Sequence, residues 1–100
     1  MNGKARRHLR GLGHHLNPIV RVGQGGVTEG VIRAADAALL DHELIKVKVA
    51  ITERDDRKAA AAALATTCNA ELVHTIGKVV VLYRANAKAN PKLSNILRYT

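Results

Sequence analysis

Several residue types are scarce in this 100-residue sequence. Phenylalanine and tryptophan are absent, tyrosine and proline each occur twice, and cysteine occurs once. A single cysteine has no intramolecular partner, which excludes a disulfide-stapled scaffold. No apolar run approaches the ~20 residues of a membrane-spanning helix, and the basic N-terminus leads into no apolar signal-peptide core. We therefore expect one soluble, cytoplasmic domain whose core is built from valine, isoleucine and leucine.

Acidic residues are missing from both ends of the chain. Sixteen lysines and arginines stand against eight aspartates and glutamates, so the formal net charge is +8. All eight acids lie between residues 29 and 71, and the segments 1–28 and 72–100 each contain five basic residues. This cationic excess favours a polyanionic partner, either nucleic acid or a membrane surface. The membrane is the weaker alternative, because the first predicted helix lacks a bulky apolar face.

Apolar periodicity predicts an α/β fold with the order helix, strand, helix, strand, helix, strand, strand. In the first helix, Ala5, Leu9, Leu12 and Leu16 share one face, with the basic residues opposite, and Asn17-Pro18 ends it. The remaining predicted elements are strand 19–22, helix 29–42, strand 44–51, helix 56–67, and strands 71–76 and 79–84. We expect the four strands to form a mixed sheet. Lys46 and Lys48 share one face of their strand, which indicates helices on one side of the sheet and a partly open second face.

A glycine loop joins the first strand to the second helix. The loop runs from Gly23 to Gly26, and Thr28 is a good N-cap for the helix that follows. The loop lacks the lysine of a Walker P-loop and the third glycine of a dinucleotide fingerprint. What remains is G-x-x-G, the loop type that clamps a nucleic-acid backbone in KH domains. Two glycines that serve only the geometry of the turn are the alternative.

The sequence does not indicate an enzyme. The five histidines lack metal-ligand spacing with Cys68, and the acids form no catalytic pair, so we expect no cofactor, no metal and no small-molecule substrate. Cys68 is expected to be a small core residue. Base recognition usually needs stacking aromatics, and Tyr83 lies in a predicted core strand. Recognition of RNA backbone and shape is therefore favoured over recognition of a single-stranded sequence.

Four blocks in this order resemble a known family. The blocks are residues 12–18, 22–31, 42–48 and 76–84, and the similarity extends over roughly residues 4–84. Together they resemble the CRM domain, whose single-domain bacterial members are the YhbY-like RNA-binding proteins. The resemblance implies a two-layer α/β sandwich similar to the C-terminal domain of bacterial translation initiation factor three. It also implies RNA binding and association with precursors of the large ribosomal subunit.

The resemblance also indicates a binding site. It implies that the glycine loop approaches the RNA backbone with the basic first helix beside it. Many family members, especially those of plants, have a lysine inside the loop, whereas here the interior residues are Gln24 and Gly25, so charge has to come from Arg21 and the first helix. The predicted RNA-binding residues are Lys4, Arg6, Arg7, Arg10, Arg21, Gly23, Gln24, Gly25, Gly26 and Thr28.

These observations predict a monomeric protein with one CRM-like RNA-binding domain, residues 1–84, and a basic, flexible C-terminal tail, residues 85–100. The expected partner is RNA, specifically ribosomal RNA of the large-subunit precursor, and the expected role is in ribosome assembly. The alternative is an adaptor that docks on acidic ribosomal or assembly-factor surfaces through the basic helix, without direct contact with RNA.

Overall fold

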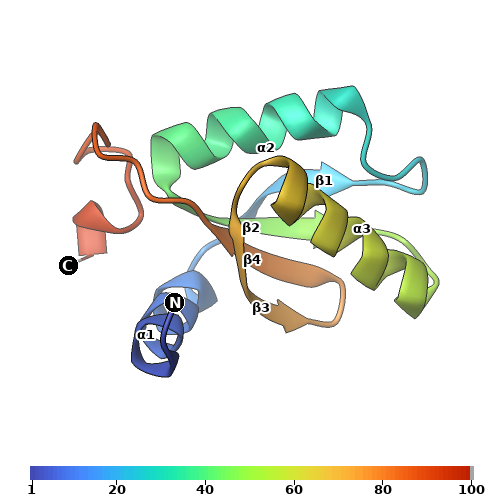
Figure 1. The fold of residues 1–100 in the computed structure, drawn as a ribbon, viewed down its shortest axis with the longest axis horizontal. Helices are drawn as coiled ribbons and strands as arrows, with labels where there is room; N and C mark the ends of the chain where they lie inside the picture. The colour runs from blue at the N-terminus through green and yellow to red at the C-terminus, as the bar shows by residue number, and fades with distance from the viewer. Residues whose placement is uncertain (100) are drawn as a thin grey trace.

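The computed structural model describes residues 1–99 and confirms the predicted order of elements. Three helices accompany a four-stranded mixed sheet in an α/β fold (Figure 1). The elements are α1 (Gly3–His14), β1 (Pro18–Val22), α2 (Glu29–His42), β2 (Leu44–Val49), α3 (Arg54–Thr67), β3 (Glu71–Ile76), β4 (Val79–Tyr83) and a final 3₁₀ turn, η1 (Leu97–Tyr99). No helix within residues 1–99 has the length and apolar character needed to cross a membrane.

The sheet has the strand order β1-β2-β4-β3. β1 and β2 are parallel and are connected through α2, whereas β4 runs antiparallel to both of its neighbours, β2 and β3. The predicted hairpin at Gly77-Lys78 joins β3 to β4, and Gly77 has the positive φ of 55° that favours glycine there. β1 and β3 therefore form the two edges of the sheet.

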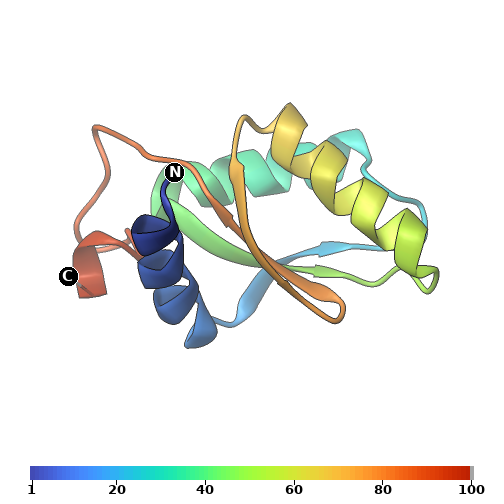
Figure 2. The ribbon, with the colours of Figure 1, turned by 60° about the horizontal axis from the view of Figure 1, so that its bottom comes forward.

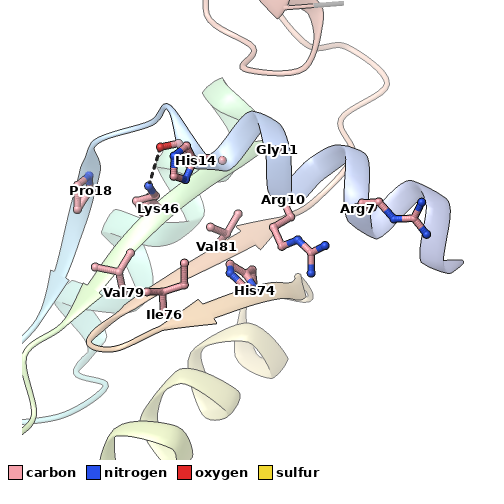
Figure 3. Close-up of a pocket in the computed structure, with 11 residues that line it drawn as sticks. Arg7, Arg10, Gly11, His14, Pro18, Lys46, His74, Ile76, Val79 and Val81 are labelled. Carbon is pink, nitrogen blue, oxygen red and sulfur yellow. Dashed lines mark hydrogen bonds between the residues drawn. The ribbon is translucent and has the colours of Figure 1, made fainter.

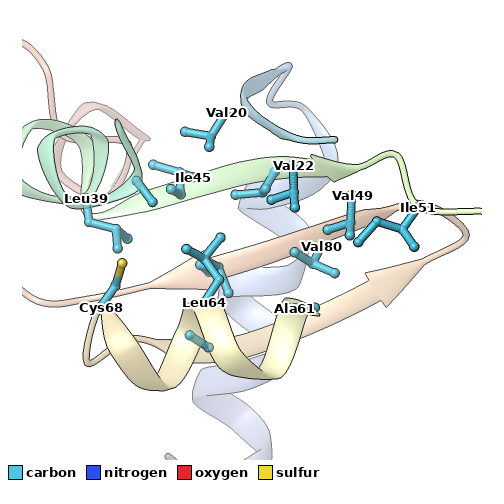
Figure 4. Close-up of a cluster of buried hydrophobic side chains, with 14 residues drawn as sticks. Val20, Val22, Leu39, Ile45, Val49, Ile51, Ala61, Leu64, Cys68 and Val80 are labelled. Atoms are coloured by element: carbon cyan, nitrogen blue, oxygen red, sulfur yellow. The ribbon is translucent and has the colours of Figure 1, made fainter. Parts of the chain in front are cut away.

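α2 and α3 cover one face of the sheet and form the larger core with it (Figure 4). Val22, Val47 and Val49 project from the strands toward Leu39 of α2 and Leu64 of α3, and all five are fully buried. Cys68 is also buried in this core, as expected for a small core residue. Burial raises the pKa of its thiol, and the carboxylate of nearby Asp36 adds to the increase.

α1 packs against the second face of the sheet, at one end of it (Figure 2), so the prediction that the helices lie on one side is correct for α2 and α3 and wrong for α1. Leu9 joins Leu44, Val73 and Val81 in a smaller buried cluster, and the rest of this face is left open, as the two lysines of β2 predict. Ala5, placed on the apolar face of α1 from the sequence, is exposed instead, and Gly13 is buried. A Cβ at Gly13 would lie 2.9 Å from Cγ1 of Val81, so the missing side chain allows α1 to approach β4 closely.

The segment after β4, for which the sequence predicts a flexible tail, is hydrogen-bonded to the domain within residues 85–99. The hydroxyl of Ser94 donates to Oε1 of Glu43 (2.7 Å), and the backbone N–H of Asn86 donates to Oε2 (2.9 Å). The side chain of Asn95 donates to the carbonyl of Leu44 (2.7 Å), and Ser94 is fully buried. Polar side chains, which carry no apolar periodicity, hold this segment in place. Thr100 lies outside the described residues.

Candidate nucleic-acid interface

Two rows of side chains cross the open face of the sheet. Strand pairing aligns Arg21 of β1 with Lys48 of β2, and aligned residues of neighbouring strands project to the same face. We name the two rows the outer row and the inner row. The outer row consists of Arg21, Lys48, Val79 and Ile76, and the inner row consists of Pro18, Lys46, Val81 and His74. The open face is therefore cationic over β1 and β2 and apolar over β4 and β3.

α1 overhangs the inner row and encloses a groove with it (Figure 3). This α1 groove has a volume of about 710 Å³ and contains no acidic side chain in its lining. The lining residues are Arg7, Arg10, Gly11, Gly13 and His14 from α1, and Pro18, Lys46, His74, Ile76, Val79 and Val81 from the sheet. Nζ of Lys46 donates to the carbonyl of His14 at 3.5 Å, where a cation also complements the negative end of the helix dipole.

The cations of this face have no carboxylate partner within residues 1–99. The ion pairs in this part of the chain are Arg33 with Glu29 and Arg84 with Asp36, at 3.4 and 2.7 Å. Arg7, Arg10, Arg21, Lys46 and Lys48 are in neither pair. Because like charges on directly opposed strand residues repel, the alignment of Arg21 with Lys48 costs free energy that a bound anion would offset.

The predicted basic residues of α1 fall into two groups. Arg7 and Arg10 line the α1 groove, whereas Lys4 is exposed near the start of the helix and lies outside the groove lining. The sequence predicts that Arg6 points away from the sheet, but its side chain reaches β3. Its Nη1 donates to the carbonyls of Leu72 (2.7 Å) and Val73 (3.3 Å), so the guanidinium fastens α1 to β3.

The glycine loop forms a tight turn at the end of β1. The N–H of Gly26 donates to the carbonyl of Gly23 (3.0 Å), and Gly26 has a φ of 79°, which favours glycine. A Cβ at Gly23 or Gly25 would meet nothing within 4 Å, and neither residue has a positive φ. Within the described residues, the fold thus requires glycine only at the last of the three positions.

Two side chains, one inside this turn and one after it, help to hold it. Oε1 of Gln24 accepts a hydrogen bond from the N–H of Thr52 (3.2 Å), which ties the loop to the connection between β2 and α3. Oγ1 of Thr28 accepts from the N–H of Val31 (3.2 Å) and caps α2, as predicted. Gln24 is therefore a positioning residue, and the positions that a Cβ of Gly23 or Gly25 would occupy are open.

α1 does not lie beside the glycine loop, contrary to the expectation from the sequence. The two occupy opposite ends of the molecule (Figures 1 and 2), and the hollow next to the loop is lined by Glu53 and Asp56. The cations nearest to the loop along the strands are Arg21 and Lys48 in the outer row. The RNA-binding residues predicted from the sequence do not include Lys46, Lys48, His14 and His74. Alternation along residues 44–51 was a signal for the lysines, but only strand pairing aligns Lys48 with Arg21 and Lys46 with Pro18.

Comparison with known proteins identifies the fold family. The model of the CRS1/YhbY (CRM) domain family matches residues 1–84. The chain belongs to this family. This CRM domain is 47% identical over 94 residues to the "Probable RNA-binding protein PA4753" of Pseudomonas aeruginosa, covering 94% of this chain and 90% of the relative. It is 43% identical over 93 residues to an "RNA-binding protein" of Haemophilus influenzae, covering 93% of this chain and 94% of that protein.

A solved structure supports the same assignment. The solution structure of the hypothetical protein SAV1595 of Staphylococcus aureus, described there as a candidate RNA-binding protein, superposes on this CRM domain with a TM-score of 0.79 at 40% sequence identity. The match covers 88% of this chain and 92% of the other. Within residues 1–99 of this CRM domain, no three histidine, cysteine, aspartate or glutamate side chains are arranged to hold a metal ion.

Proposed function

We propose that this CRM domain binds RNA through the open face of its sheet and has no catalytic activity. The observation that carries the proposal is the set of cations on this face that have no carboxylate partner within residues 1–99 and that lie in successive rows between the α1 groove and the glycine loop. RNA is the polyanion that the names of its relatives indicate. We further propose that the bound RNA is ribosomal RNA of the large-subunit precursor and that this monomeric protein assists ribosome assembly in the cytoplasm.

The cationic side chains supply most of the affinity in this proposal. Arg7 and Arg10 line the groove at one end, Lys46 and Lys48 lie on β2, and Arg21 lies nearest to the loop. Each cation that neutralises a phosphate releases condensed counterions, so affinity falls as salt rises. With about five such contacts, the logarithm of the binding constant falls with the logarithm of the salt concentration with a slope of about −4.

The glycine loop supplies backbone N–H donors at the far end of the face. Gly23 and Gly25 have no side chain to keep a phosphate away from the main chain, and α2 begins three residues after the turn, at Glu29. N–H groups of such turns and of a helix N-terminus attract phosphate oxygens. The loop therefore adds phosphate contacts without a lysine of its own.

Matched charge reversals on the two faces of the sheet test this surface. We expect Lys48→Glu and Arg10→Glu each to weaken binding to a structured large-subunit rRNA fragment about tenfold at 0.1 M salt and to reduce the salt slope by about one. The controls Arg54→Glu and Lys58→Glu make the same charge change on α3, which covers the other face. If the four variants weaken binding equally, only net charge matters and the proposed surface is wrong.

The ribosomal assignment needs a separate experiment. Crosslinking in cells, followed by sequencing of the attached RNA, is expected to recover large-subunit rRNA, with the protein in precursor fractions of a ribosome gradient. An adaptor without RNA contact would instead sediment with the particles and yield no crosslinked RNA. In that case purified protein would show no salt-dependent binding to the rRNA fragment.

A further inference from the structure

The floor of the α1 groove has a chemistry that phosphate binding does not require. Val79 and Val81 of β4 form it together with Ile76 of β3, and Ile76 is 61% exposed. Arg7, Arg10 and Lys46 lie at its margins. An exposed apolar surface bordered by cations suits a ligand with an apolar face next to a negative charge. A nucleotide has this combination, because its base is flat and weakly polar on both faces and its phosphate is anionic.

The groove also has the size for such a ligand. Its volume of about 710 Å³ lies within the range of about 300–1,000 Å³ that is typical of small-molecule sites, which is sufficient for one base with its ribose. His74 is half-buried in the groove, and the side chain of Arg10 extends from α1 over the groove (Figure 3). Imidazole rings and guanidinium planes stack on unpaired bases in RNA-binding proteins. In a chain without phenylalanine or tryptophan, these side chains are available for stacking.

Gly11 provides an independent observation, because it keeps the groove uncovered. A Cβ at Gly11 would meet nothing within 4 Å, and its φ is not positive, so neither packing nor backbone geometry requires glycine there. Glycine within a helix costs about 1 kcal/mol relative to alanine. α1 therefore keeps a less stable residue at a position that lines the groove and where a larger side chain would take up space at its margin.

We propose that the α1 groove holds one unpaired nucleobase of the bound RNA. The base lies on Val79 and Ile76 and stacks against His74 or Arg10, and the adjoining phosphate contacts Arg7 or Lys46. This inference rests on the proposed function and adds a base-dependent contact to the backbone contacts of the open face. RNA with an unstacked nucleotide, such as a single-nucleotide bulge, is then preferred over a continuous duplex.

Two RNA hairpins that differ by one base test the inference. One has a single unpaired adenine, and the other has an abasic nucleotide at the same position. We expect the wild-type protein to bind the adenine hairpin about tenfold more tightly. The methyl NMR signals of Val79 and Ile76 are expected to shift with the adenine hairpin and to move little with the abasic one.

Gly11→Leu is the decisive variant, because it adds an apolar side chain at the margin of the groove and removes no charge. It is expected to abolish the preference for the adenine hairpin and to leave the affinity for the abasic hairpin and the salt slope unchanged. Gly11→Ala is the matched control and keeps most of the preference. Thermal unfolding of both variants checks that each is folded.

Three outcomes would overturn the inference: equal affinity of the wild type for the two hairpins, a preference that survives in Gly11→Leu, or loss of affinity for both hairpins in that variant. In each of these cases the protein still binds RNA, so the proposed function stands. Absence of wild-type binding to either hairpin and to the rRNA fragment would contradict the proposed function itself.

Discussion

Two glycines of α1, two positions apart, have different effects on the fold. Gly13 is buried against β4, where a Cβ would lie 2.9 Å from Cγ1 and 3.1 Å from Cγ2 of Val81. Val81 is itself buried and branched at Cβ, so it has little freedom to move aside. Gly11 faces open space. The same substitution is therefore expected to change stability in opposite directions at the two positions.

We predict that Gly13→Ala lowers the free energy of unfolding by about 1–3 kcal/mol, because overpacking outweighs the gain in helix propensity. Gly11→Ala is the control and is expected to raise it by about 0.5–1 kcal/mol. Urea unfolding followed by circular dichroism measures both changes. An increase in stability for Gly13→Ala would show that α1 does not approach Val81 as closely as described.

The thiol of Cys68 and the hydroxyl of Tyr83 make the free energy of unfolding depend on pH in the alkaline range. Burial raises the pKa of both groups. The nearby carboxylate of Asp36 adds a smaller increase for Cys68, and that of Glu43 adds one for Tyr83. An unfolded thiol loses its proton near pH 8.5 and an unfolded phenol near pH 10, so above those values the native state binds more protons than the unfolded state. The free energy of unfolding therefore decreases as pH rises through this range.

The cysteine contribution can be measured by comparison with Cys68→Ala. We predict that the wild type loses more stability than this variant between pH 8 and pH 10, because the variant has no thiol to ionise on unfolding. Chemical unfolding at a series of pH values gives the difference, in which changes common to both proteins cancel. Parallel pH profiles would mean that the thiol has the same pKa in the folded and unfolded states.

At the scale of elements, the C-terminal segment, residues 85–99, is hydrogen-bonded to the junction of α2 and β2. Glu43 ends α2 with a φ of 60°, an unusual conformation for a residue other than glycine, and its buried carboxylate accepts from Ser94 and Asn86. Asn95 covers the start of β2 by donating to Leu44. These hydrogen bonds therefore satisfy polar groups that the backbone hydrogen bonds of α2 and β2 leave without partners.

We predict that Ser94→Ala destabilises the protein by about 1–3 kcal/mol, because Oε1 of the buried Glu43 carboxylate loses a hydrogen-bond donor. Lys92→Ala, at an exposed position two residues earlier, is the control and is expected to change stability by less than about 0.5 kcal/mol. Thermal unfolding gives the midpoint temperature of each variant and of the wild type. Equal midpoints for Ser94→Ala and wild type would indicate that the segment is detached in solution.

At the scale of the whole molecule, the +8 net charge is distributed unevenly. Unpaired cations occupy the open face and the groove side of α1, whereas Glu53 and Asp56 border the hollow beside the glycine loop. Repulsion among the cations destabilises the free protein, and phosphate groups would remove that repulsion on binding. Salt is therefore expected to affect folding and RNA binding in opposite directions.

We predict that raising NaCl from 0.01 to 0.15 M raises the melting temperature of the free protein, because the screening length decreases from about 30 Å to about 8 Å. The same increase is expected to weaken RNA binding. Differential scanning calorimetry measures the first effect and equilibrium titration the second. A melting temperature that decreases over this range would mean that the cations of the open face do not limit stability.

Local signals determined the order of elements and part of the site. The alternation in residues 44–51, the Thr28 cap and the Gly77-Lys78 hairpin predicted their elements correctly, and so did the assignment of Cys68 to the core. Arg7 and Arg10 were correctly placed on a helix, and they line the α1 groove. Each of these features depends on residues within one turn or strand, where backbone geometry and side-chain periodicity act over a few positions.

Tertiary structure alone decided how these parts meet. It placed α1 on the second face of the sheet, used Arg6 to hold β3, aligned Arg21 with Lys48, separated α1 from the glycine loop and attached Ser94 to Glu43. The hydrogen-bonded partners Arg6 and Leu72 are 66 residues apart in the chain, and Ser94 and Glu43 are 51 apart. Periodicity carries no information about such pairs, because strand register and the packing of elements set which distant groups come into contact.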